Sequence, residues 1–310
     1  MKLQFSRLDA LLLLMTVIWG SNYSVIKAAL REIPPVGFNA LRLMLASATF
    51  LVAIAAKKGP YPFFGTEKGV RPLFRRDWIG IVALALVGQF IYQLLFMSAL
   101  SRTSVANSSL IIGCTPIFVA LLTAALGHER ITALRWAGAA LSAFGIYLVI
   151  GHDASVSRAS LAGDLTMVAA VMCWSAATVG SRPLLARHSP LVVTGYSMAI
   201  GSALYAPFGW SDLRGLAWRD VSTGAWLALG FSAVFALCVA YMIWYTAVQR
   251  LGNTRTAVYS NMVPIAAMLV ARFWLGEHIG ILKIAGAAAI ILGVALTKVQ
   301  LDGQPVGEPA

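Results

Sequence analysis

The sequence predicts an all-α integral membrane protein with ten transmembrane helices, arranged as two inverted five-helix repeats. Three observations lead to this prediction: an apolar composition, ten long apolar runs, and a residue pattern that recurs in the second half. Of the 310 residues, 59% are hydrophobic and only 12% are charged, about half the charged share of a soluble domain. One soluble core cannot hide so much apolar surface, which disfavours a soluble enzyme, a nucleic-acid binder and a disordered chain.

The ten apolar runs each have about the 20 residues that a helix needs to cross the hydrocarbon core. The first run follows a basic start, as in a signal peptide, but it continues to about Leu30 without a small-residue cleavage pattern. We therefore interpret it as a retained helix. Short connections make consecutive helices antiparallel, and an even number puts both termini on one side. The runs cover 9–30, 36–56, 77–100, 103–126, 132–150, 163–185, 191–210, 223–249, 253–275 and 279–298.

The basic residues indicate which side that is. The formal net charge of +12 would suggest nucleic acid in a soluble chain, but in a membrane protein loop Lys and Arg orient the helices. With the N-terminus inside, 15 of the 24 basic residues face the cytoplasm and 8 face outward, while Arg42 lies within the second helix. Six of the 15 come from the loop 57–76. We predict a plasma (inner) membrane protein with both termini cytoplasmic.

The second half of the chain repeats features of the first. At an offset of 155 residues, Asp9, Trp19, Lys27 and Pro35 coincide with Asp164, Trp174, Arg182 and Pro190. At an offset of 148, Trp78, Ala99, Arg102, Pro116, Glu129, Gly138 and Gly145 coincide with Trp226, Ala247, Arg250, Pro264, Glu277, Gly286 and Gly293. We predict two domains, 1–152 and 153–310. Because each holds an odd number of helices, the second is inverted, as in many secondary transporters.

These repeated residues resemble a known family. The first copy has Trp19-Gly20-Ser21-Asn22, Pro35, Ala40-Leu41-Arg42 and Glu129-Arg130-Ile131-Thr132; the second has Pro264, Leu275-Gly276-Glu277, Gly286 and Gly293. The pattern is similar to the EamA-type members of the drug/metabolite transporter superfamily, and it resembles amino-acid exporters of the YddG type. The resemblance implies a ten-helix exporter of amino acids or metabolites, but the family does not fix the substrate. The second copy departs from the first with Ser175-Ala176-Ala177 for Gly20-Ser21-Asn22 and Ser197 for Arg42.

Polar and aromatic side chains gather near the midpoints of four predicted helices. Polar groups in hydrocarbon usually face a water-filled cavity or another helix, and an aromatic wall with scattered amides suits a neutral or zwitterionic organic substrate. We predict that these residues line a midplane cavity, with interhelical packing as the alternative. They are Trp19, Asn22 and Tyr23 in the first helix, Gln89, Tyr92 and Gln93 in the third, Trp174 and Thr178 in the sixth, and Tyr241, Trp244 and Tyr245 in the eighth.

Arg42 lies about two turns inside the second helix, with Asn39 on the same face. No acidic residue falls in the interior of a predicted helix to neutralise it. Arg42 therefore either binds a substrate carboxylate or extends outward toward Glu32. Lys27 is nearer its helix end, and we expect it to reach toward the interface.

Pro116 and Pro264 lie at the centres of the fourth and ninth helices, where each removes a backbone hydrogen bond. They act either as symmetric hinges or as static kinks. Tyr259 lies nearby and can add polar lining. The small-residue stripes at Gly138 with Gly145, and at Gly286 with Gly293, indicate close packing within the bundle or between protomers. A monomer and a homodimer both remain open.

The sequence lacks acidic residues inside its predicted helices, and it also lacks catalytic and metal-binding motifs. All twelve acidic residues lie at predicted helix ends or in loops, which favours a uniporter or loosely coupled carrier over a proton antiporter. The sequence has no phosphate-binding loop and no helical metal motif, so we predict no catalytic residue, no metal and no cofactor. The expected partners are a small-molecule substrate and the lipid bilayer. We favour export of neutral or aromatic amino acids; the alternatives are efflux of other metabolites or drugs, and a membrane-embedded enzyme.

Overall fold

The computed structural model describes residues 7–56, 72–125, 133–151, 158–251, 256, 259–260 and 262–298, and every regular element within these ranges is helical. The predicted domain boundary at 152–153 and most of the basic loop 57–76 lie outside the described residues. The α-helices are α1 (Arg7–Ala29), α2 (Pro35–Ala55), α3 (Arg75–Leu84), α4 (Tyr92–Arg102), α5 (Val105–Gly113), α6 (Thr115–Ala125), α7 (Ala133–Gly151), α8 (Arg158–Leu185), α9 (Pro190–Arg214), α10 (Thr223–Phe231), α11 (Ala240–Leu251), α13 (Val263–Val270) and α14 (Ile281–Lys298). Three segments are π-helical: η1 (Ala85–Ile91), η2 (Ser232–Val239) and η3 (Ala271–Leu275).

Seven helical stretches within the described residues are long and apolar enough to cross a membrane. They are Arg7–Ala29, Pro35–Ala55, Arg75–Arg102, Val105–Leu122, Ala159–Leu185, Pro190–Arg214 and Thr223–Leu251. Their outward faces carry exposed apolar side chains such as Leu14, Val52, Phe208 and Leu227. An apolar exterior of this kind is what contact with lipid requires. The protein is a multi-pass membrane protein.

The helix starts follow from local sequence. Ser104, Ser189 and Ser222 immediately precede α5, α9 and α10, and each side-chain oxygen accepts a hydrogen bond from a backbone amide of the first turn. Pro35 and Pro190 lie at the first positions of α2 and α9, where a missing amide hydrogen leaves no partner unsatisfied. These signals place the turns that bring consecutive helices back antiparallel.

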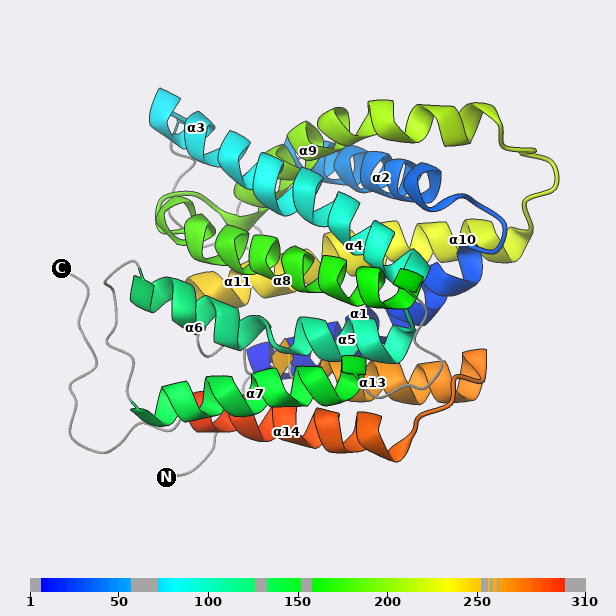
Figure 1. Ribbon diagram of the computed structural model, residues 1–310. Helices are drawn as coiled ribbons and strands as arrows, with labels where there is room; N and C mark the ends of the chain where they lie inside the picture. The colour runs from blue at the N-terminus through cyan, green and yellow to red at the C-terminus, as the bar shows by residue number, and fades with distance from the viewer. Residues whose placement is uncertain are drawn as a thin grey trace.

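The helices lie side by side along one direction, so the bundle has two ends (Figure 1). α1 begins and α14 finishes at the end on the left of Figure 1, which we call the Arg7 end. α4 finishes, and α5 and α8 begin, at the opposite end, which we call the Lys27 end.

Helices of the first half pack mainly against helices of the second. α2 contacts α9 and α7 contacts α14, so each pair joins corresponding helices of the two halves. The contact between α1 and α13 corresponds to that between α8 and α6, and the contact of α2 with η2 corresponds to that of α9 with η1. These helix contacts are therefore present in both halves.

Small residues allow the closest of these contacts. A Cβ atom added at Gly20 would lie 2.5 Å from the Cβ of Ala266, so α1 approaches α13 more closely than any larger residue permits. At Gly145, an added Cβ would lie 2.8 Å from the carbonyl oxygen of Gly286. Gly145 of α7 and Gly286 of α14 thus allow close packing within the chain.

The predicted fourth helix is broken in two. α5 ends at Gly113 and α6 begins at Thr115, so that Pro116 is the second residue of a new helix rather than a kink inside one. Pro264 is likewise the second residue of α13. Proline has no amide hydrogen to give to the preceding turn, which explains why the chain restarts there.

Two π-helical segments occupy corresponding positions in the two halves. Moved by the repeat offset of 148 residues, η1 falls on residues 233–239, within η2. In each segment the following amide reaches back five residues: Tyr92 donates to Val87 and Ala240 donates to Phe235. A π-helical turn leaves one carbonyl without its usual helical donor, and such turns are frequent at functional sites.

Candidate functional site

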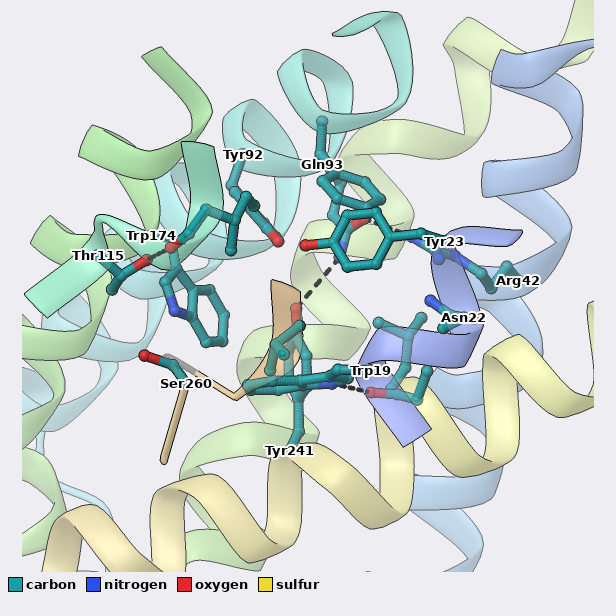
Figure 2. A pocket seen from close by; sticks show the side chains of 15 residues that line it. Trp19, Asn22, Tyr23, Arg42, Tyr92, Gln93, Thr115, Trp174, Tyr241 and Ser260 are labelled. Carbon is teal, nitrogen blue, oxygen red and sulfur yellow. Dashed lines mark hydrogen bonds between the residues drawn. The ribbon is translucent and has the colours of Figure 1, made fainter. Parts of the chain in front are cut away.

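A cavity of about 50 Å³ lies at the centre of the bundle. Both halves contribute to its wall. The first half provides α1, α2, α4 and the α5–α6 break, and the second provides α8, η2, α11, Ser260 and the start of α13. In Figure 2, Trp19 and Tyr241 face Tyr92 and Gln93 across the centre, and Trp174 lies opposite Arg42. The lining residues are Trp19, Asn22, Tyr23, Arg42, Tyr92, Gln93, Phe96, Ile112, Thr115, Trp174, Ala236, Leu237, Tyr241, Ser260 and Val263.

Corresponding residues of the two halves meet in this wall. Trp19 and Trp174, which are 155 residues apart, contact edge to face with ring centroids 5.9 Å apart. Gln93 and Tyr241, which are 148 apart, share a hydrogen bond of 3.3 Å from the amide nitrogen to the phenol oxygen. Two further corresponding pairs also line the cavity, namely Ile112 with Ser260 and Thr115 with Val263. The cavity therefore lies where the two halves meet.

A π-helical carbonyl holds Trp19 in place. Because the amide of Ala240 donates to Phe235 instead of Ala236, the carbonyl of Ala236 lacks its usual helical donor. The indole nitrogen of Trp19 donates to this oxygen at 3.0 Å. One irregular turn in η2 thus fixes the orientation of an aromatic side chain on α1.

Aromatic rings from both halves contact one another at the cavity wall. Trp19 lies 6.0 Å from Tyr241 and 5.5 Å from Trp244, measured between ring centroids. Trp174 lies 5.2 Å from both Tyr92 and Tyr241. Rings at these separations contact through their edges or tilted faces, an arrangement that is more favourable than direct stacking.

Arg42 supplies a positive charge at the edge of the cavity. Its side chain is only 1% exposed, and its guanidinium donates to Asn39 at 3.0 Å, Ser232 at 3.0 Å and Gln93 at 2.6 Å. The guanidinium carbon also lies 6.0 Å from the ring centre of Phe96. All three acceptors are neutral. A guanidinium has five N–H groups, so two remain without an acceptor among the described residues.

The side chain of Arg42 does not extend outward to Glu32. The carboxylate of Glu32 instead accepts hydrogen bonds from the amide and the hydroxyl of Ser222, at 2.7 and 2.8 Å. These two bonds hold the pKa of Glu32 below its ordinary value, because they stabilise the ionised form. Of the two alternatives for Arg42, the structure has the one in which its guanidinium lies at the cavity.

The structure brings eight of the fourteen predicted site residues to the cavity wall: Trp19, Asn22, Tyr23, Arg42, Tyr92, Gln93, Trp174 and Tyr241. Five others are close behind or beside it. Asn39 binds Arg42, Thr178 donates to the carbonyl of Trp174, Gln89 is buried in η1, and the rings of Trp244 and Tyr245 contact Trp174. Tyr259 is the exception, because its hydroxyl donates to Asp9 near the Arg7 end.

Seven of the lining residues are not among these fourteen: Phe96, Ile112, Thr115, Ala236, Leu237, Ser260 and Val263. Thr115 and Val263 immediately precede the two central prolines, so the proline positions were a usable signal for them. Ala236 also contributes a backbone carbonyl, which no side-chain pattern reveals. Among the described residues, no group of His, Cys, Asp and Glu side chains is arranged to hold a metal ion.

A multi-pass helical protein whose central cavity lies between two corresponding halves has the architecture of a membrane transporter. The comparison with family models identifies which class of transporter. The chain belongs to the EamA-like transporter family, whose model matches residues 7–151 and again residues 161–299.

Named relatives align with nearly the whole chain. A probable terminal-alkyne amino-acid exporter of Streptantibioticus cattleyicolor is 30% identical over 285 residues, which is 92% of this chain and 91% of the relative. A probable amino-acid metabolite efflux pump of Escherichia coli is 27% identical, covering 93% of this chain and 94% of the pump. The uncharacterised transporter YyaM of Bacillus subtilis is 26% identical, with 92% and 91% covered. A solved crystal structure shares the fold, with a TM-score of 0.64 at 22% identity, covering 93% of this chain and 95% of that one.

Proposed function

We propose that this protein exports small organic solutes, most readily neutral or aromatic amino acids, by alternating access around the central cavity. One observation carries the proposal: the two halves jointly enclose an aromatic cavity that holds a buried arginine with only neutral acceptors. The printed names of two relatives, an amino-acid exporter and an amino-acid metabolite efflux pump, support it.

The halves are proposed to be inverted repeats within a ten-helix protein whose termini are both cytoplasmic. Two observations support this relation. Corresponding helix pairs make contacts in both halves, and the corresponding residues Trp19 and Trp174, and Gln93 and Tyr241, contact each other. With this topology the Lys27 end faces outward. Inverted halves can exchange conformations, so that the closed end of one state becomes the open end of the other.

Arg42 is proposed to bind the carboxylate of the substrate. Its two remaining N–H groups can donate to the two oxygens of one carboxylate, which is the geometry that arginine favours. The aromatic rings of Trp19, Trp174 and Tyr241 then contact the apolar part of the solute. No carboxylate lines the described wall, so a purely cationic drug finds no counter-charge there.

The size of the cavity supports a conformational change during transport. Pockets that bind organic ligands usually measure about 300–1,000 Å³, whereas this cavity measures about 50 Å³ and has room for a few water molecules. A solute can enter only when helices or rings move apart. We therefore assign the structure to a contracted state of the transport cycle.

Flux of radiolabelled solutes through purified protein in liposomes tests the function. We expect exchange of phenylalanine or leucine, and little exchange of the corresponding decarboxylated amines. Arg42→Gln should weaken affinity for the amino acid about tenfold to a hundredfold, because a hydrogen bond to a charged group contributes about 1.5–3 kcal/mol. Arg219→Gln, at an exposed loop position, serves as the matched control.

Equal flux of amino acids and decarboxylated amines would contradict the role of Arg42. Absence of flux for every amino acid, with flux of another metabolite or of a drug, would contradict the proposed substrate class. Arg42→Lys, which keeps the charge but not the paired donors, should give an intermediate affinity.

A further inference from the structure

The turn between α4 and α5 is held by three ionisable side chains from three different parts of the chain. Residues 103 and 104 form this turn at the Lys27 end of the bundle. Lys27 of α1 binds its carbonyls, Glu277 binds its amides, and Asp164 of α8 binds its side chains. Asp164 and Glu277 belong to the second half, whereas the turn belongs to the first.

Lys27 binds where α4 finishes. Its ammonium donates to the carbonyls of Leu100 and Thr103, at 2.7 and 2.5 Å. These carbonyls belong to the last turn of the helix, where the helix dipole favours a positive charge. The sequence-based expectation that Lys27 simply reaches toward the interface is therefore incomplete, because its amine has specific acceptors.

Glu277 binds where α5 begins. Its two carboxylate oxygens accept hydrogen bonds from the amides of Val105 and Ala106, at 2.9 and 3.2 Å. Gly276, which directly precedes it, has a φ of 70°, a left-handed conformation that glycine adopts readily. This turn after η3 brings the carboxylate onto the amides at the start of another helix, where a negative charge is favoured.

Asp164 connects α8 to the same turn. Its side chain is 1% exposed, and it accepts hydrogen bonds from the hydroxyl of Thr103 at 2.5 Å and the amide group of Asn107 at 3.1 Å. Gly163 permits this approach, since an added Cβ would lie 3.0 Å from the Cβ of Arg102. Both oxygens of the carboxylate are therefore engaged with the first half.

The helices on either side of this turn form part of the cavity wall. α4 carries Tyr92, Gln93 and Phe96, and α5 carries Ile112 just before the break at Cys114. A displacement of the turn is therefore transmitted directly to lining residues. The break next to Pro116 allows α5 to move without carrying α6 along.

We propose that Asp164 and Glu277 are positioning residues of an outer gate, which closes the cavity by fixing the α4–α5 turn of the first half against the second. This inference rests on the proposed alternating-access function. Release of the solute to the outside requires these four cross-half hydrogen bonds to break. Neither residue lines the cavity, so both act on its opening and not on the contacts that bind the solute.

Access of a water-soluble thiol reagent to the cavity from outside tests the gate. Cys114, Cys173 and Cys238 are first replaced by alanine, and Ser260 in the cavity wall is changed to cysteine. In intact cells, a membrane-impermeant maleimide should label this cysteine about tenfold faster in Asp164→Asn and in Glu277→Gln, because each change weakens charge-assisted hydrogen bonds of the closed state. Substrate affinity of the purified variants should equal that of the parent or exceed it by up to about tenfold, because the state that admits the solute is more populated.

Glu32→Gln is the matched control. Glu32 also lies at the Lys27 end, also accepts hydrogen bonds at the start of a helix, and also joins the two halves, but its partner is Ser222 and not the α4–α5 turn. We expect its labelling rate to equal that of the parent. A second cysteine position, Thr194 in α9, is buried away from the cavity and should remain unlabelled in every variant, which excludes general loosening of the fold.

Unchanged labelling in both Asp164→Asn and Glu277→Gln would overturn the gate, as would faster labelling from the cytoplasmic side alone. Equal acceleration in Glu32→Gln would also overturn it, because the effect would then not be specific to the α4–α5 turn. If the parent protein carries no solute in liposomes, the proposed function fails. The labelling result still reports on the gate independently.

Discussion

The two halves of the protein share their helix packing but differ at the cavity. The first half contributes Asn22, Arg42 and Gln93; at the corresponding positions the second half has Ala177, Ser197 and Tyr241. The polar groups thus come mainly from one half. Packing of the helix backbones is similar in the two halves, whereas the recognition that we propose for the solute is one-sided, so the two properties depend on different residues.

The environment of Arg42 explains why its charge cannot simply be transferred to the other half. Its acceptors Asn39, Gln93 and Ser232 correspond to Thr194, Tyr241 and Leu84. The second half therefore lacks the two side-chain amides that hold the guanidinium. Ser197, at the position of Arg42, donates instead to the carbonyl of Thr194 within its own helix.

Exchanging these two residues should give the largest effect. In the double variant Arg42→Ser with Ser197→Arg, we expect substrate affinity at least about a hundredfold below wild type, because no amide acceptors orient the new guanidinium. Calorimetric titration of the purified protein measures this affinity. Recovery of wild-type affinity in a monodisperse sample would show that the one-sided arrangement has no role in recognition.

A smaller effect is expected within the aromatic cluster, where Trp19 lines the cavity and Trp244 lies behind it. Trp19→Ala should weaken substrate affinity about tenfold, since an aromatic contact with its apolar area contributes about 1–3 kcal/mol. Trp244 is fully buried and contacts Trp19 and Trp174 without lining the cavity. Trp244→Ala should lower stability by about 3–5 kcal/mol and affect affinity less than Trp19→Ala does.

Thermal unfolding and substrate binding, both measured on the same purified variants, separate the two roles. A lower affinity for Trp244→Ala with unchanged stability would assign that ring to the solute site. Unchanged affinity with lower stability for Trp19→Ala would assign the ring of Trp19 to packing.

The smallest expected effect concerns a proton gradient. The described cavity wall takes its polar groups mainly from the first half and its aromatic groups from both halves, but it has no carboxylate from either. An imposed pH difference across the liposome membrane should therefore leave flux down the solute gradient unchanged. Uphill accumulation driven by the pH difference alone would contradict this expectation and direct attention to Asp164, the buried carboxylate at the Lys27 end.

The membrane class and the family were predictable from the sequence. Long apolar runs such as 77–100 and 223–249 can form stable structure only in lipid or a very large core. The recurrence of Trp19 as Trp174 and Pro116 as Pro264 showed that one half repeats the other. Both signals are local or periodic, so they can be read without coordinates.

The roles of individual residues were less accessible. Tyr259 falls near the midplane in the sequence pattern but bonds to Asp9. Glu277 falls at a predicted helix end, but its carboxylate binds the start of α5. In both cases the partner lies more than 170 residues away. Helical periodicity gives the face of a helix, but it does not give the neighbour that the face meets.

By itself, the sequence determined that the chain is helical, lies in a membrane and consists of two related halves, because these properties follow from composition, run length and repetition. Only the tertiary structure decided which polar groups meet. The side chain of Arg42 could face the cavity or extend toward Glu32 until the positions of Gln93 and Ser232 were known. The carbonyl of Ala236 became an acceptor for Trp19 only through the π-helical turn of η2. Hydrogen bonds act over about 3 Å, and distances on that scale are fixed by how helices pack.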